Sequence, residues 1–94
     1  MVTGLVEEVG SIDQMHSNPD GLEISIRGKK VLEDLKVDDS VSCSGICLTV
    51  IKVSKEKFTV QLVEETLSRT NAQFWKNDTA INLERALLPS TRIG

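Results

Sequence analysis

The side chains with the most distinctive chemistry in this chain are two cysteines and a single histidine. Cys43 and Cys47 on one extended strand would lie about 13 Å apart, too far for a disulfide, although a sharp turn at Gly45 would relax that limit. Two cysteines make no disulfide framework, so we expect reduced thiols, as in the cytosol. His16 lies among turn residues, and a zinc site would lack both the ligands and the spacing.

Other candidate groups each have an ordinary structural alternative. Cys47 is either a reactive thiol or a small buried apolar residue. Thr49 and Ser40 offer hydroxyl groups to a ligand, or they are a β-branched strand residue and a turn residue. Glu64 and Glu65 contact a ligand, or they stand at a helix N-terminus, where the helix dipole favours acid. The chain carries no nucleophile elbow, P-loop, dinucleotide fingerprint or metal motif, so these residues alone leave the function open.

Strands are expected to position these groups, because Val, Ile and Thr together number 24 and Ala appears three times. Apolar and polar residues alternate, as in half-buried strands, in residues 22–26, 58–62 and 81–84. Residues 5–12 predict an opening strand with a bulge at Gly10. Around residues 47–53 both parities carry apolar residues, which predicts a strand covered on both faces.

Turns and short helices are predicted between the strands. Pro19 within residues 17–21 predicts a turn, and the charged residues 55–57 predict a hairpin loop. Short helices are predicted at residues 30–35 and 64–70. Residues 36–41 resemble residues 76–81, which we interpret as shared turn chemistry rather than as a repeat. Five or six short strands with two helical turns predict a small closed all-β barrel, with Gly10 and Gly45 at its corners.

Length and composition exclude several classes of protein. Ninety-four residues predict one domain, and an apolar content of 39% is typical of globular proteins rather than disordered ones. The longest apolar run is three residues, too short for a membrane span or a signal sequence. A net charge of −3 and only three aromatic side chains argue against a nucleic-acid partner.

Five motifs occur in order along the chain. The most specific is Gly-Ile-Cys-Leu-Thr-Val at residues 45–50. The others are Met-Val-Thr-Gly-Leu-Val at 1–6, Glu-Glu-Thr-Leu at 64–67, Ile-Asn-Leu-Glu-Arg-Ala at 81–86 and Ser-Thr-Arg-Ile-Gly at 90–94. In this combination, residues 1–94 resemble the first of the two similar lumazine-binding barrels of the riboflavin synthase family.

The resemblance implies a six-stranded antiparallel Greek-key barrel and the family reaction. In that reaction two molecules of 6,7-dimethyl-8-ribityllumazine dismutate to riboflavin and a pyrimidinedione, with no metal or organic cofactor. The family's site lies between the first barrel of one subunit and the second barrel of a neighbour in a homotrimer. For the isolated domain we expect little synthase activity and a two-fold homodimer. We expect a cytoplasmic protein with a small-molecule ligand and no nucleic-acid or membrane partner.

The resemblance also assigns site residues by position. Ser40 and Cys47 would be the catalytic pair, with Ser40 near the reacting ring. Gly4, Leu5 and Val6 would offer backbone groups along the pteridine. The remaining substrate-binding positions are Cys47, Leu48, Thr49, Gln61, Leu62, Val63, Glu64, Glu65 and Thr66. Rigid backbone groups suit a flat heterocycle, whereas hydroxyl and amide groups suit a ribityl chain.

Some features depart from the family pattern. Val2 stands where the family usually has phenylalanine, and Ser44 stands where asparagine is frequent. The family continues past Gly94 into a second barrel, so half of the composite site would be absent. Two functions therefore follow: a part of riboflavin synthase, or a stand-alone module that binds lumazine or flavin like the family's non-catalytic fluorescent relatives. The residue 45–50 motif favours the first, and a barrel without a ligand is a third alternative.

Overall fold

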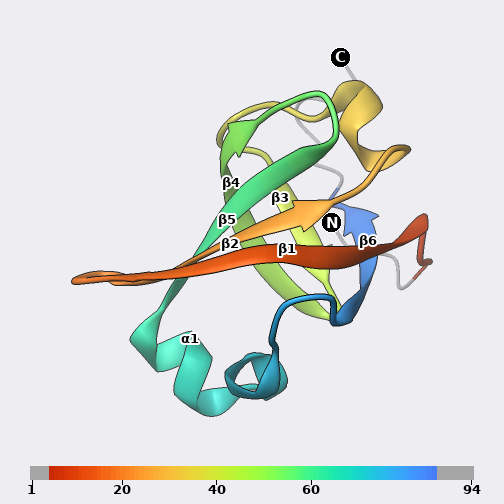
Figure 1. Cartoon of the computed structure of the whole chain (residues 1–94). Coiled ribbons are helices and arrows are strands. Elements are labelled where there is room, and N and C mark those ends of the chain that lie inside the picture. The colour runs from red at the N-terminus through yellow and green to blue at the C-terminus, as the bar shows by residue number, and fades with distance from the viewer. Residues whose placement is uncertain (1–4, 87–94) are drawn as a thin grey trace.

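Six β-strands form a closed barrel in the computed structural model, which describes residues 5–86 (Figure 1). The strands are β1 (Glu8–Asn18), β2 (Gly21–Arg27), β3 (Ser40–Cys43), β4 (Ile46–Val53), β5 (Lys57–Val63) and β6 (Ala80–Arg85). Around the barrel their order is β1-β2-β5-β4-β3-β6, and every neighbouring pair is antiparallel. The predicted six-stranded antiparallel barrel is confirmed.

Three short helical segments connect the strands. They are η1 (Val31–Asp34), α1 (Glu64–Arg69) and η2 (Asn71–Phe74), of which only α1 is an α-helix. Both helices predicted from the sequence are present, although the first is a 3-10 helix, and η2 was not predicted. The α1 and η2 segments lie together at one end of the barrel (Figure 1). No helix within residues 5–86 is long and apolar enough to cross a membrane.

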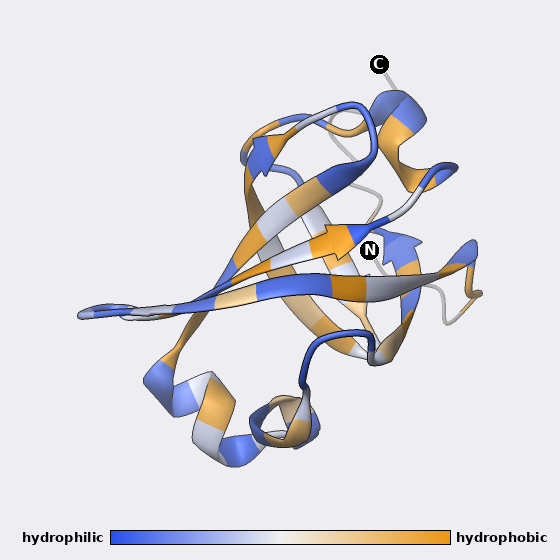
Figure 2. Ribbon diagram, viewed as in Figure 1, coloured by the Kyte–Doolittle hydropathy of each residue, from blue (hydrophilic) through white to orange (hydrophobic). Residues whose placement is uncertain are grey.

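Alternate side chains of the strands fill the barrel interior. The alternation is visible as bands of contrasting hydropathy along the ribbons (Figure 2). The buried strand residues include Ile12, Ile24, Ile26, Val41, Val50, Phe58, Val60, Leu62, Ile81 and Leu83. Period-2 alternation places one face inward wherever the other is polar, so the strands predicted at residues 22–26, 58–62 and 81–84 are confirmed.

The first strand differs from its prediction in its bounds. β1 begins at Glu8 rather than at residue 5, and it continues to Asn18. His16 therefore lies on a strand, exposed and opposite Glu23, and the prediction that it belongs to a turn is wrong. Only Pro19 and Asp20 remain in the turn to β2. The end of β1 is mostly polar and pairs only with β2, so no apolar alternation marks it as a strand, which is why the sequence suggested a turn.

The predicted bulge at Gly10 is also wrong. Gly10 pairs regularly with Ile81 of β6, and the bulge of β1 lies at Asp13, between Ile12 and Gln14. A Cβ atom at Gly10 would collide with the carbonyl oxygen of Arg27. Glycine is therefore needed here for the close approach of two backbones rather than for a bulge.

β4 is not covered on both faces, contrary to the prediction. A bulge at Ile51, between Val50 and Lys52, shifts the parity of the side chains along the strand. Before the bulge, Leu48 and Val50 face the core, while Cys47 and Thr49 are exposed. The apolar residues on both parities thus follow from one extra residue in the strand.

The first three strands of the chain, β1–β3, and the last three, β4–β6, form two halves that share several local features. Each half has a bulge in its first strand, at Asp13 and at Ile51. Each half then enters its last strand through an aspartate in the left-handed region, with φ of 78° at Asp38 and 71° at Asp78. The amide of Asp38 donates to the carbonyl of Val50, and that of Asp78 to the carbonyl of Ile12, both at 2.8 Å. The likeness of residues 36–41 and 76–81 therefore includes the hydrogen bonds that link these turns to the strand residues beside the two bulges.

Candidate functional site

A row of polar side chains crosses the outer face of three neighbouring strands. Ser40 of β3 is paired with Thr49 of β4, and Thr49 is paired with Gln61 of β5. Directly paired residues of antiparallel strands point to the same side of the sheet, with Cβ atoms about 5 Å apart. Thr49 is exposed, and the other two are half-buried. The register therefore brings three of the predicted site residues together.

Cys47 borders this row and owes its position to a tight turn. Ser44 and Gly45 join β3 to β4 with φ of 49° and 87°, the combination typical of two-residue hairpin turns. The turn places Cys43 toward the core and Cys47 on the exposed outer face, so the two free thiols cannot bridge. Burial raises the pKa of the Cys43 thiol to about 12. Of the two thiols, only Cys47 is available to a ligand.

The remaining predicted residues of β4, β5 and α1 form two groups: two leucines with buried side chains, and residues 63–66 at the junction of β5 and α1. The side chains of Leu48 and Leu62 face the core, so these residues can offer only backbone groups to a ligand. Val63, at the end of β5, is 53% exposed. Glu64, Glu65 and Thr66 follow it in the first turns of α1, where Glu65 forms an exposed ion pair with Arg69 at 3.3 Å.

The predicted N-terminal part of the site lies beside β6. The amide of Glu7 donates to the carbonyl of Leu83 at 2.8 Å, so the chain before β1 continues along β6. Leu5 and Val6 are 73% and 52% exposed. Gly4 lies outside the described residues. Because β6 pairs with β3, the outer surface presents in order the N-terminal segment, β6, β3, β4 and β5.

An ion pair that the sequence did not suggest holds this segment in place. The Arg85 Nη2 atom lies 2.6 Å from Glu7 Oε2, and Arg85 Nε donates to Glu7 Oε1 at 3.0 Å. The Arg85 backbone amide also donates to Oε1, at 2.7 Å. Hydrogen bonding from Arg85 lowers the pKa of Glu7 to about 2. The only signals in the sequence are an acidic residue directly after the residue 1–6 motif and a basic residue within the residue 81–86 motif.

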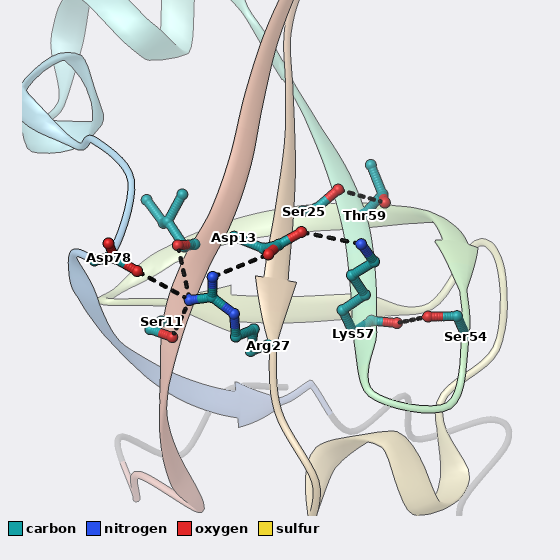
Figure 3. Close-up of polar contacts among 9 residues, drawn as sticks. Ser11, Asp13, Ser25, Arg27, Ser54, Lys57, Thr59 and Asp78 are labelled. Atoms are coloured by element: carbon teal, nitrogen blue, oxygen red, sulfur yellow. Dashed lines mark hydrogen bonds and ion pairs between the residues drawn. The ribbon is translucent and has the colours of Figure 1, made fainter.

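Figure 3 shows a second charge network, which contains none of the residues of the polar row. Asp13, on the β1 bulge, forms ion pairs with Arg27 at 2.9 Å and with Lys57 at 3.0 Å. Arg27 also contacts Asp78, at 3.2 Å. The hydrogen bond from Lys57 is the main cause that lowers the pKa of Asp13. Because these residues tie β1, β2 and β5 together at the start of β5, we assign them a structural role.

Two cavities differ in their relation to the polar row. The larger, about 1070 Å³, is lined by residues of the second charge network and by the β4–β5 loop. The smaller, about 420 Å³, lies between the β3–β4 turn and η2, with Ser44, Ile46, Thr70 and Trp75 in its wall. Ile46 directly precedes Cys47 in β4, so their side chains point to opposite sides of the sheet, and no residue of the polar row lines the smaller cavity. Among residues 5–86, no three His, Cys, Asp or Glu side chains are grouped to hold a metal ion.

Comparison with known proteins gives one consistent result. The family model of the lumazine binding domain matches residues 3–86. Riboflavin synthases of Photobacterium phosphoreum, Actinobacillus pleuropneumoniae and Bacillus subtilis are 42%, 39% and 37% identical to the chain. Each match covers 100% of this chain and 44% of the relative, so the chain spans less than half the length of these relatives.

Proposed function

Because the chain belongs to the lumazine-binding domain family, we propose that it binds 6,7-dimethyl-8-ribityllumazine and riboflavin. We further propose that it does so as one barrel of a riboflavin synthase, with its biological role in riboflavin synthesis. Relatives of that name are 34–42% identical to it. The binding surface would be the outer face of β3, β4 and β5, together with the N-terminal segment beside β6.

The polar row is the observation that carries this proposal. Ser40, Thr49 and Gln61 present two hydroxyl groups and an amide to solvent on a rigid sheet. A ribityl chain carries several hydroxyl groups, and such groups need partners that both donate and accept hydrogen bonds. Ligand sites combine a few fixed polar groups of this kind with apolar walls. Exposed Leu5, Val6 and Val63 supply apolar surface at the two sides.

In the proposed reaction, one lumazine molecule transfers a four-carbon unit to another. The site must therefore bind both molecules with their reacting rings in contact. Positioning two reactants supplies a large share of the rate in reactions of this kind. Ser40 and Cys47 are the residues that we propose beside the reacting ring. One barrel supplies one substrate position, so we propose that the second is supplied by another barrel. The alternative function is a stand-alone module that binds lumazine or flavin without turnover, which the exposed row supports equally.

Titration of the domain with riboflavin tests the binding proposal. We expect saturable quenching of flavin fluorescence at micromolar protein. Thr49→Val removes one exposed hydroxyl and is expected to weaken binding about fivefold, because one hydrogen bond contributes about 1 kcal/mol. Ser54→Ala removes a hydroxyl in the β4–β5 loop and is the matched control, with no change expected. Absence of quenching at high micromolar domain would contradict the proposal.

A second test measures the turnover of the same preparation. With the lumazine as substrate, we expect the domain alone to form riboflavin at a small fraction of the rate of the two-barrel Bacillus subtilis relative. The reason is that the isolated domain lacks the second barrel that would bind the other substrate molecule and hold it in position. A rate near that of the relative would show that one barrel suffices and would refute this expectation.

We also propose that the isolated domain forms a two-fold homodimer in the cytoplasm. A two-fold contact is self-complementary, and it would cover exposed apolar side chains such as Val63 and Phe74. Free Cys43 and Cys47 fit a reducing compartment. Sedimentation velocity at tens of micromolar, with and without riboflavin, should show a dimer. A monomer under both conditions is the result that would overturn it.

A further inference from the structure

The polar row continues beyond the predicted site residues. Gln61 of β5 is paired with Glu23 of β2, and Glu23 is paired with His16 of β1. The row therefore crosses five strands, from Ser40 to His16. Adjacent strands lie about 4.8 Å apart, so Glu23 lies about 10 Å from Thr49 across the sheet. A carboxylate thus stands in line with the hydroxyl and amide groups that we propose for the ligand.

The structure fixes the carboxylate of Glu23 in this position. The Asn18 side-chain amide donates to Glu23 Oε2 at 3.0 Å. Asn18 is itself held, because its Oδ1 accepts from the Asp20 backbone amide in the β1–β2 turn, also at 3.0 Å. Glu23 is half-buried. Its negative charge is therefore presented at a defined point rather than on a freely rotating side chain.

Along the row itself, Glu23 is the first charged side chain past Gln61. His16 is exposed and stands opposite Glu23. Glu64 is a second carboxylate, at the start of α1. Lys52 stands in the next row, opposite Thr59, whose hydroxyl is hydrogen-bonded to Ser25 (Figure 3). The paired positions of the row past Gln61 are Glu23 and His16. A ligand that extends along the row would therefore meet the Glu23 carboxylate first, and these positions hold no lysine or arginine.

We propose that Glu23 is a specificity-determining residue that makes the site select a free ribityl chain over one that ends in a phosphate. This rests on the proposed function, with the ring at the β6–β3 side and the chain directed along the row. A carboxylate accepts a strong hydrogen bond from a terminal hydroxyl. The same carboxylate repels a phosphate dianion, and such a repulsive element is an effective source of specificity.

Paired titrations with riboflavin and riboflavin 5′-phosphate test this inference. For the unmodified domain we expect at least about tenfold tighter binding of riboflavin, narrowing as ionic strength rises, since salt screens exposed charges. Glu23→Gln should reduce the preference to within about threefold, mainly by tightening the phosphate ester. Glutamine keeps an acceptor for Asn18, and thermal melting checks that the variant folds.

Glu56→Gln is the matched control. It removes the same charge from an exposed residue just before β5, about 17 Å along that strand from Gln61. The preference for riboflavin should be unchanged in this variant. Equal binding of both flavins by the unmodified domain would overturn the inference and leave the proposed function standing. An equal effect of Glu56→Gln would overturn it too, whereas binding of neither flavin would overturn the proposed function itself.

Discussion

Replacing Phe58 with alanine is expected to lower the free energy of unfolding by about 3–5 kcal/mol. Phe58 is 1% exposed and is among the largest side chains that the barrel buries completely. It is paired with Ile26 of β2 and with Val53 of β4, so its ring supports the interior where three strands meet. A small domain is stable by about 5–15 kcal/mol, so this single cavity would remove a large fraction of its stability.

Urea unfolding measures the effect, and the chain provides its own control. Phe74→Ala deletes the same ring from a side chain that is 72% exposed on η2. We expect that variant to change the free energy of unfolding by no more than about 0.5 kcal/mol. The denaturant slope should stay the same in both variants, since the fold is retained. Similar losses from the two substitutions would show that the barrel interior is not where the structure places it.

Replacing Glu7 with glutamine is expected to cost about 2 kcal/mol at neutral pH, because hydrogen bonds to charged groups are stronger than neutral ones. Both side chains of the Glu7–Arg85 pair are only 23% exposed. Riboflavin affinity should also fall about tenfold, since the segment containing Leu5 and Val6 would be held less firmly beside β6, where the backbone hydrogen bond from Glu7 to Leu83 remains. Asp78→Asn changes an exposed ion pair and should alter neither quantity.

The pH dependence identifies the Glu7 carboxylate specifically. Its pKa is lowered from 4.5 to about 2 in the folded protein. Its stabilising contribution is therefore complete above pH 4.5 and is lost as the pH falls from there toward 2. Unfolding curves at several pH values should show the difference between the unmodified domain and Glu7→Gln shrinking over that window. A difference that is constant down to pH 2 would rule out the ion pair as its cause.

Much of the barrel could be predicted from local patterns, and its exceptions have physical reasons. Alternation marks β2, β5 and β6 because each has one face in the core. The bulges at Asp13 and Ile51 could not be predicted, because a bulge depends on the partner strand as much as on its own residues. The same cause produced the wrong bulge at Gly10 and the wrong two-sided burial of β4.

For the candidate site, the resemblance supplied residues but not their geometry. The register that aligns Ser40, Thr49 and Gln61 joins three strands and cannot be deduced from spacing along the chain. Glu23 lies outside every motif that carried the resemblance, and only pairing with Gln61 connects it to the row. The roles of Ser40 and Cys47 stay predictions.

Closure of the barrel has a consequence for how the chain folds. The β1–β2 and β4–β5 hairpins join neighbouring segments, but the Glu7–Arg85 pair connects residues 78 positions apart. Contacts between such distant segments form at an entropic cost, because a long loop of chain must be closed. Proteins dominated by such contacts fold in about milliseconds to seconds rather than microseconds. During synthesis, the pairing between β1 and β6 that closes the barrel cannot form until Arg85 has left the ribosome. Until then the nascent hairpins expose apolar faces and unpaired strand edges, which is the period when the chain is most open to aggregation.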